Sequence, residues 1–460
     1  MARDVTDTTP ITSRDALVAW IESGEKPSAE FRIGTEHEKF AFYRNDLAPV
    51  PYEGRPFHGV GSIKLLLEGM QSKLGWEPVS DNGHIIGLFD AAAGAAISLE
   101  PGGQFELSGA PLDTIHEMKA ELEHHLSVLK AIAEPMEIGF LGLGMNPKWR
   151  LSDIPLMPKQ RYAIMMKYMP KVGSRGLDMM FRTCTVQANL DFSSEADMVK
   201  KLRVSLGLQP LVTALFANSP FTDGKLNGFL SARSEIWRHT DQARTGMLPF
   251  AFEAGMSYER YVDYALSVPM YFVKRGGLYH NVAGADFRDL LQGKLVELPG
   301  EQAMLSDWAN HLSTIFPEVR LKRYLEMRGA DAGSRPFLVA LPALFAGLLY
   351  EPSSLDAAWD LIKDWNEEER EQLRADVPRL GLKAMVHGRR LKDVAAHALA
   401  IARDGLARRN RRDSSGQDEA AFLAPLERVI SEMSEAERLI EKYKTQWRGN
   451  VDSVFEDCAY

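Results

Sequence analysis

Two glutamates, Glu36 and Glu38, are separated by a single residue in the stretch 32–42, which alternates like a β-strand. Side chains two positions apart in an extended chain point to the same face, so both carboxylates are expected on one face. Like charges in this relation repel each other unless a cation lies between them or they face open water. The pair therefore indicates either a cation site or a solvated, acidic edge strand.

A second strand-like stretch repeats the arrangement after a Pro-Gly-Gly turn. Residues 95–100 and 104–108 are expected to form a hairpin around that turn. Gln104 and Glu106 would share one face of the returning strand, and Glu100 would end the preceding strand. The hairpin thus offers two further carboxylates and an amide.

Two more stretches align polar groups at the period of a strand. The stretch 182–191 puts on one face Thr183, Thr185, Gln187, Asn189 and Asp191. The stretch 320–331, expected to be one strand, puts on one face Lys322, Tyr324, Glu326 and Arg328. An antiparallel sheet with one face on the core and one face wet would show this alternation.

The polar residue types decide which chemistry is possible. Magnesium prefers carboxylate oxygens, keeps several waters and is commonly shared with substrate phosphates. An arginine beside a carboxylate, as Arg328 is beside Glu326, can hold a phosphate with two hydrogen bonds. The pattern favours magnesium–nucleotide chemistry above a sheet, and a merely polar sheet face is the alternative. The chain has no G-x-x-x-x-G-K-[ST] loop, and the glycines of 139–144 lack dinucleotide-binding spacing.

The sequence stretches before, between and after these strands have the periodicity of α-helices. Helices are expected at about 12–23, 62–74, 113–134, 161–169, 194–216 and 228–237, and residues 355–448 are expected to be helical apart from an exposed loop near 408–417. The predicted fold class is α+β. We expect one catalytic domain over 1–460, with an α+β core of about 12–350 and a helical C-terminal portion of about 351–460.

Composition excludes several classes of protein. The net charge of −9 and the scattered basic residues argue against a nucleic-acid surface. The longest apolar run, 337–350, is interrupted by Pro342 and is too short to span a bilayer, so no membrane association is expected. With two distant cysteines and an acidic N-terminus that lacks a secretory or transit pattern, we predict a cytoplasmic protein. Cys184 points with the apolar face of its strand and is expected to be buried.

Six segments together resemble the motifs of one known family. They are residues 34–39, 100–108, 181–191, 218–221, 244–248 and 324–331. The chain resembles glutamate–cysteine ligase of the plant and proteobacterial type from about residue 12 to residue 460. This resemblance implies a curved antiparallel sheet flanked by helices, similar to the catalytic domain of glutamine synthetase. It also implies an ATP-dependent acid–amino-acid ligase, the first enzyme of glutathione synthesis, which joins the γ-carboxylate of L-glutamate to L-cysteine through a γ-glutamyl phosphate and releases ADP and phosphate.

The resemblance suggests roles for the aligned residues. The carboxylates expected to hold two or more Mg²⁺ ions are Glu36, Glu38, Glu100, Glu106 and Glu326. Of these, Glu36 and Glu38 are also expected to be catalytic, together with Arg328, which would bind the ATP phosphates with Lys322 as a further candidate. Substrate binding is expected from Thr183, Gln187, Asn189, Arg233, Trp237 and Arg244. A substrate carboxylate needs an arginine, and either Arg233 or Arg244 would bind that of glutamate.

Two other functions stay open at this point. A related ligase could join glutamate to a different amine, and a cation-binding protein could have kept the site and lost turnover. Acceptor-dependent release of ADP separates all three. The small-molecule partners expected are L-glutamate, L-cysteine and ATP, and the chain is expected to be a monomer or a homodimer.

Overall fold

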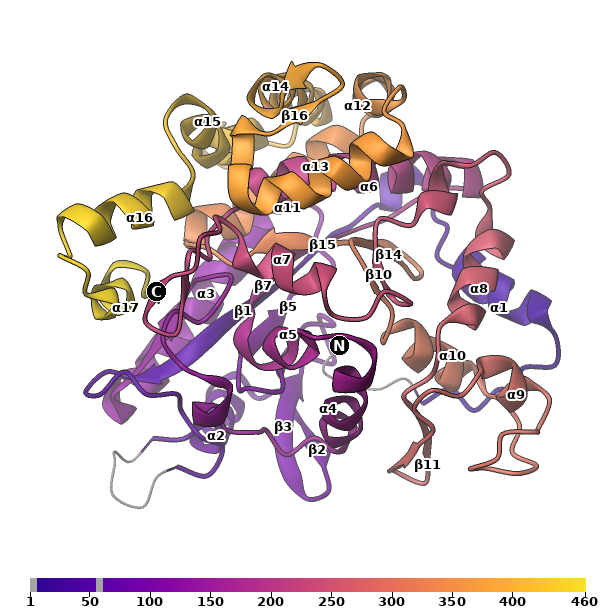
Figure 1. The fold of residues 1–460 in the computed structure, drawn as a ribbon. Helices are drawn as coiled ribbons and strands as arrows, with labels where there is room; N and C mark the ends of the chain where they lie inside the picture. Colours follow the sequence, from indigo (N-terminus) through magenta and orange to yellow (C-terminus); the bar gives the residue numbers. More distant parts are fainter. Residues whose placement is uncertain (1–5, 55–60) are drawn as a thin grey trace.

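One large antiparallel sheet organises the computed structural model, which describes residues 6–54 and 61–460 (Figure 1). Within these residues nine strands are paired in the order β14-β15-β7-β1-β5-β4-β3-β2, with β6 also paired to β1. The strands are β1 (Ile33–Tyr43), β2 (Glu77–Asp81), β3 (His84–Phe89), β4 (Ala96–Leu99), β5 (Phe105–Ser108), β6 (Ile138–Leu141), β7 (Thr185–Leu190), β14 (Val319–Leu321) and β15 (Leu325–Asp331). The predicted α+β class with an antiparallel sheet is confirmed.

Strand β1 carries the acidic pair and lies at the centre of the sheet. Its 11 residues pair with β7 at one end, with β5 in the middle and with β6 at the other end. The predicted hairpin is present as β4 and β5, in which Ser98 is the register partner of Glu106. Period-2 alternation places His37 and Lys39 on the face opposite Glu36 and Glu38, where the Lys39 ammonium group lies 2.9 Å from Nδ1 of His37.

Three helices cover the apolar face of the sheet. They are α3 (Ile115–Ala133), α6 (Glu195–Leu215) and α11 (Arg335–Leu349). A capping box begins α3, in which the Thr114 side chain accepts from the Glu117 N–H and the Glu117 side chain accepts from the Thr114 N–H. Helix α11 is apolar around its whole circumference, and it is correspondingly buried from Phe337 to Leu349.

The polar face of the sheet lies beneath α4 (Gln160–Val172), α5 (Gly176–Arg182) and α7 (Ala232–Arg238), which cross in front of the strands (Figure 1). Ser231 caps α7 by accepting a hydrogen bond from the Ser234 N–H. These short helices and the sheet enclose the site described below.

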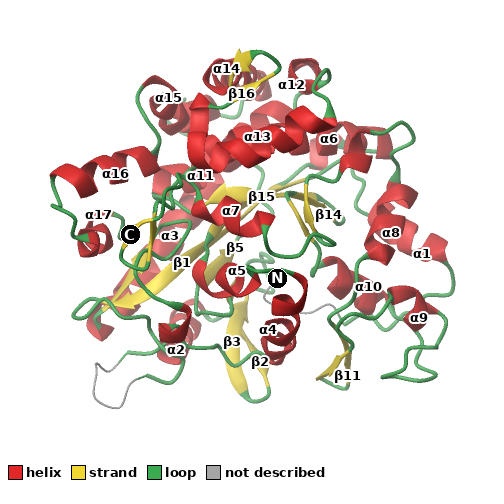
Figure 2. Ribbon diagram, viewed as in Figure 1, coloured by secondary structure: helices red, strands yellow, loops and turns green. Residues whose placement is uncertain are grey.

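The C-terminal part of the chain is mainly helical (Figure 2). Its helices are α12 (Pro352–Ile362), α13 (Glu367–Leu380), α14 (Leu391–Arg409), α15 (Ala424–Ser431), α16 (Glu435–Thr445) and α17 (Val454–Asp457). Helices α12 to α15 pack on α6 or α11, whereas α16 and α17 contact other elements, with Tyr443 beside Phe221 and Phe455 beside Phe42. The expectation of a helical segment 355–448 is wrong at one place, where β16 (Met385–Val386) and β17 (Arg389–Arg390) form a hairpin with His387 and Gly388 at positive φ. The division into a core of about 12–350 and a helical portion of about 351–460 stays a prediction.

The expected single strand over 320–331 is also wrong. Backbone hydrogen bonding between Lys322 and Tyr324 closes a tight turn between β14 and β15. Strand β15 then contains a bulge against β7: the four residues from Met327 to Ala330 lie opposite only three, from Ala188 to Val186.

The remaining elements lie around this framework. They are α1 (Arg14–Glu22), α2 (Ile63–Leu74), α8 (Tyr258–Ser267), α9 (Phe287–Leu291), α10 (Leu305–Leu312), β8 (Phe221–Thr222), β9 (Lys225–Leu226), β10 (Thr245–Gly246), β11 (Phe272–Arg275), β12 (Leu278–Asn281) and β13 (Phe316–Pro317). Among the described residues no single helix has both the length and the apolarity of a membrane span; α11 and α12, bent by 94° at their junction, meet that test only as a pair.

Candidate active site

Four glutamates line one hollow above the polar face of the sheet. Glu36 and Glu38 come from β1, Glu106 from β5, and Glu100 follows β4. Other lining residues come from α4, α5, α7 and the strands, among them Gln104, Arg161, Tyr162, Met165, Met179, Met180, Thr183, Thr185, Gln187, Arg233, Trp237, Phe316, Arg320 and Arg328. We call this hollow the central pocket.

Three of these carboxylates repel one another. Glu38 is the register partner of Glu106 across β1 and β5, and Glu38 accepts a hydrogen bond from the Thr185 N–H at 2.9 Å. Burial, followed by repulsion from Glu100 and Glu106, raises the pKa of Glu38 well above its ordinary value. Burial and Glu106 likewise raise the pKa of Glu100. Bound cations would relieve this repulsion.

The carboxylates are near neighbours but do not form a preformed metal cage. Within residues 6–54 and 61–460, no group of three or more His, Cys, Asp or Glu side chains is close enough to enclose a metal ion. Magnesium does not require such a cage, because it keeps several of its waters and takes oxygen ligands from substrate phosphates. The donor types at Glu38, Glu100 and Glu106 thus fit Mg²⁺.

Glu326 has a different environment from the one we expected. It is completely buried, and its carboxylate pairs with Arg320 at 2.5 Å, Lys322 at 3.0 Å and Arg328 at 2.8 Å. Burial alone would raise its pKa, but these three cations hold the pKa well below the ordinary value. Glu326 does not line the central pocket, because its oxygens are already occupied by cations. The structure thus places Glu326 in a cluster of cations beside the central pocket, and its role as a metal ligand stays a prediction.

Lys322 also departs from its expected place. It lies in the turn between β14 and β15, and only 3 % of its surface is exposed. Its ammonium group donates to Glu326 and does not line the central pocket, so the expected contact with the ATP phosphates stays a prediction. Lys322 instead helps to neutralise Glu326.

Arg328 connects the Glu326 cluster to the pocket. Its Nη1 donates to Gln187 Oε1 at 2.8 Å and to Glu326 Oε2 at 2.8 Å, so two neighbouring strands hold the guanidinium in place. The carbonyl oxygen of Arg328 accepts a hydrogen bond from Arg233 Nη2 at 2.9 Å. Two arginines, from β15 and α7, therefore face the same hollow.

The other predicted substrate-binding residues divide into two groups. Thr183, Gln187, Arg233 and Trp237 line the central pocket, whereas Asn189 lies outside it and donates to Glu36 Oε1 at 3.2 Å. The Thr183 hydroxyl group donates to the Met179 carbonyl group at 2.8 Å, which fixes the end of α5 against the sheet.

Arg244 is the clear exception. It is fully buried, donates to Asp241, to the Thr314 carbonyl group and to the Pro269 carbonyl group, and stacks on Tyr271. Its guanidinium is thus engaged outside the central pocket, and substrate binding by Arg244 stays a prediction that this geometry does not favour.

Several pocket residues were missed by sequence reasoning. Arg161 and Tyr162 project from the first turn of α4, and Arg320 projects from β14. One sequence feature could have indicated the residues of α4. It is a pair of basic residues, Lys159 and Arg161, just after Pro158 at the start of a methionine-rich helix. Periodicity gave the helix but could not show which of its faces meets the sheet.

A second pocket continues from the first along the sheet. Glu36 lines both, and the second pocket is further lined by Ser23, Lys26, Arg32, Gly34, Phe89, Ala96, Ser108, Asn189, Asp191, Arg323 and Tyr324. We call it the outer pocket.

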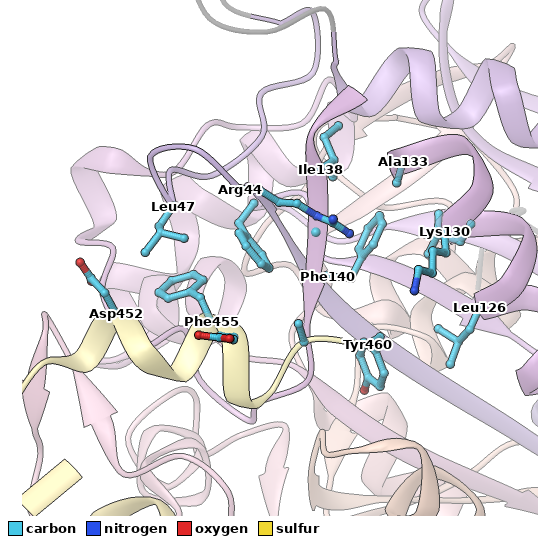
Figure 3. A pocket seen from close by; sticks show the side chains of 15 residues that line it. Arg44, Leu47, Leu126, Lys130, Ala133, Ile138, Phe140, Asp452, Phe455 and Tyr460 are labelled. Atoms are coloured by element: carbon cyan, nitrogen blue, oxygen red, sulfur yellow. The ribbon is translucent and has the colours of Figure 1, made fainter. Parts of the chain in front are cut away.

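A third hollow, shown in Figure 3, lies between α3, β6 and α17. None of the residues that line it is a predicted site residue.

Comparison with known proteins shows where the chain belongs. The model of the glutamate–cysteine ligase family 2 matches residues 32–457. Chloroplastic glutamate–cysteine ligase of Arabidopsis thaliana is 55% identical over 457 residues, which cover 99% of this chain and 84% of the relative. Chloroplastic glutamate–cysteine ligase B of Oryza sativa subsp. japonica is 53% identical over 98% of this chain and 88% of the relative.

This chain belongs to the glutamate–cysteine ligase family.

The family resemblance deduced from the six motifs is confirmed. So is the ligase activity, the joining of L-glutamate to L-cysteine in the first step of glutathione synthesis. The fold is also that of the family: glutamate–cysteine ligase of Francisella tularensis, solved in complex with AMP, superposes with a TM-score of 0.55 at 13% identity, covering 93% of this chain and 87% of the other.

The comparison corrects the expected compartment of this ligase. We predicted a cytoplasmic protein from the acidic N-terminus, but the relatives from Arabidopsis thaliana, Oryza sativa and Nicotiana tabacum are all named chloroplastic. The cytoplasmic prediction is therefore wrong by this finding, since the charge of the first residues does not identify the compartment.

Proposed function

We propose that the central pocket joins L-glutamate to L-cysteine at the expense of Mg²⁺-bound ATP, through a γ-glutamyl phosphate. The observation that carries this proposal is the approach of Glu38, Glu100 and Glu106 to one another beside Arg233 and Arg328. A cluster of buried acids next to two arginines is suited to hold a metal-bound polyphosphate and an amino-acid carboxylate at once.

Glu36, Glu38, Glu100 and Glu106 would hold two or more Mg²⁺ ions directly or through water. When bound, Mg²⁺ neutralises the charge that develops on the transferred phosphoryl group. The carboxylates orient this site because strand pairing fixes Glu38 opposite Glu106 and because Asn189 holds Glu36. The 2.6 Å hydrogen bond from the Ser108 hydroxyl group fixes Glu106 in the same way.

Arg328 would stabilise the phosphates during the transfer. The γ-carboxylate of glutamate attacks the terminal phosphorus and ADP leaves; the amine of cysteine then attacks the acyl carbon, loses a proton and displaces phosphate. Both steps gather negative charge between the substrates, so a fixed guanidinium contributes most by electrostatic stabilisation. Its hydrogen bonds to Gln187 and Glu326 supply that fixed position.

Arg233, rather than Arg244, would bind the α-carboxylate of glutamate, with Arg161 as a second cation in the same pocket. Arg233 lies 5.8 Å from the centre of the Trp237 ring and reaches into the central pocket, where Thr183 and Gln187 offer polar groups. Stacking on an aromatic ring restricts a guanidinium to one orientation, which favours selective binding of a planar carboxylate.

The nucleoside part of ATP would occupy the outer pocket. That pocket offers aromatic surface from Phe89 and Tyr324 and cations from Lys26, Arg32 and Arg323. Since Glu36 lines both pockets, the phosphates would extend past it toward the central pocket. Monomer and homodimer both stay open.

A coupled assay of ADP release tests this function. We expect ADP only when Mg²⁺, ATP and L-glutamate are present, and steady turnover only with L-cysteine. Equal turnover with unrelated amines in place of cysteine would indicate a ligase with a different acceptor. Binding of Mg²⁺-ATP with no ADP release in the complete mixture would overturn the proposal.

A further inference from the structure

A buried carboxylate outside the pocket, that of Asp331, joins three segments of the chain. It is 1 % exposed and lies at the end of β15. Its Oδ2 accepts hydrogen bonds from the Asn218 N–H at 2.9 Å and the Ser219 hydroxyl group at 2.6 Å, and its Oδ1 accepts from the Ser231 hydroxyl group at 2.9 Å. All three donors are buried, so solvent does not compete for the carboxylate.

Both serines also accept hydrogen bonds from α7, so they link Asp331 to that helix. The Ser219 oxygen accepts a hydrogen bond from the Arg233 N–H at 3.2 Å, and the Ser231 oxygen accepts from the Ser234 N–H at 3.2 Å. Each hydroxyl group therefore donates to Asp331 and accepts from the first turn of α7. The first turn of that helix carries Arg233 into the central pocket.

Close packing around Asp331 holds its side chain in one position. A Cβ atom at Gly144 would lie 2.3 Å from Cγ of Asp331, so the segment that follows β6 approaches this carboxylate as closely as only glycine allows. The Gly144 N–H donates to the Asn218 carbonyl group, which holds the same segment from the other side. Asp331 also carries the charge opposite to that of Arg233, and this attraction opposes the rise in the pKa of Asp331 that burial causes.

We propose that Asp331, acting through Ser219 and Ser231, is a positioning residue that sets the orientation of Arg233 for binding the α-carboxylate of glutamate. This inference rests on the proposed role of Arg233. Asp331 touches no substrate; its contribution is to hold the first turn of α7 at one place relative to β15. In this proposal the segment 218–221, one of the six motifs that resemble the family, connects Asp331 to α7 through Ser219.

Steady-state kinetics of Ser219→Ala and Asp331→Asn test the inference, with separate KM values for glutamate, cysteine and ATP. Loss of one buried hydrogen bond should raise the glutamate KM about five- to tenfold for Ser219→Ala, and more for Asp331→Asn, while the ATP KM and kcat change less than about threefold. Ser205→Ala is the matched control, since Ser205 is buried in α6 and its hydroxyl group has no partner in the described structure. Ser231→Ala repeats the test if Asp331→Asn does not fold.

A double-mutant cycle with Arg233→Lys decides whether the effect passes through Arg233. We expect Ser219→Ala to add less than about twofold to the glutamate KM in the Arg233→Lys background. The same factor in both backgrounds, or equal rises in all three KM values, would overturn the inference and leave the role of Arg233 intact. An unchanged glutamate KM in Arg233→Lys alone would overturn the role of Arg233 and this inference with it.

Discussion

Glu38 on β1 lies directly opposite Glu106 on β5, although adjacent like charges destabilise a strand pair. Both side chains lie at the central pocket, where burial strengthens their repulsion. A protein keeps such a pair where a cation neutralises it during function. This like-charged cross-strand pair therefore supports the proposed metal site.

Replacing Glu38 by glutamine should leave the fold intact and remove most of the activity. The change keeps the side-chain shape and relieves the repulsion, so thermal stability should be equal or higher. Loss of one metal ligand should lower kcat/KM about a thousandfold and raise the Mg²⁺ concentration needed for half-maximal rate. Glu123→Gln, at an exposed ion pair with Arg335, is the control. Near-normal turnover at saturating Mg²⁺ would contradict the metal assignment.

Glu326→Gln should behave in the opposite way with respect to stability. It leaves three cations buried without their shared carboxylate, which should lower the free energy of unfolding by about 3–5 kcal/mol. Urea denaturation of the two glutamine variants side by side measures the difference. If Glu326→Gln were as stable as the unmodified chain yet needed more Mg²⁺, Glu326 would be a metal ligand after all.

Arg244→Lys tests the structural role of the arginine that sequence reasoning placed in the site. Lysine keeps the charge but cannot reproduce the hydrogen bonds to Asp241, Thr314 and Pro269, so we expect a loss of about 2 kcal/mol in stability. The KM for glutamate of the folded enzyme should be unchanged, in contrast to Arg233→Lys. A raised glutamate KM at unchanged stability would return Arg244 to the binding site.

His311 should make the ligase sensitive to acid. Burial, the largest effect, and the nearby Arg244 lower the pKa of His311 to about 4, although the hydrogen bond to the Ala265 carbonyl group opposes the change. The unfolded chain, with an ordinary pKa near 6.5, binds the proton more readily between about pH 6.5 and 4. Stability should therefore fall as the pH falls through this window, by about 3 kcal/mol in total.

Chemical denaturation of the unmodified chain and of His311→Gln between pH 7 and 4 measures this contribution. Glutamine keeps an amide donor but does not titrate, so the stability of the variant should decline less with acid. Parallel pH curves for the two proteins would show that His311 does not account for the decline.

The strands that carry the acids were predictable because a period of two residues is a local property. Glu36, Glu38 and Glu106 have the faces that alternation assigns, and the Pro-Gly-Gly turn gave the hairpin. The turn at 322–324 was missed because Lys322, Arg323 and Tyr324 carry none of the usual turn residues.

The arginines illustrate what local pattern cannot supply. Arg233 and Arg244 are equally plausible carboxylate ligands in the sequence, and only packing separates them. The partners that retain Arg244 come from residues 241, 269 and 314, and those of Glu326 include Arg320 across a turn. Such choices depend on contacts between distant segments, which periodicity does not encode.

The bulge in β15 has a consequence for how this strand can vary. With one extra residue between Met327 and Ala330, Glu326 pairs with Asn189 and Asp331 pairs with Thr185, so two acids at an odd spacing emerge on the same side of the sheet. A one-residue insertion or deletion that leaves the bulge in place would shift the register by one position and reverse the side from which Asp331 emerges. Outside the bulge, point substitutions are therefore expected to be better tolerated in this strand than a change of one residue in its length.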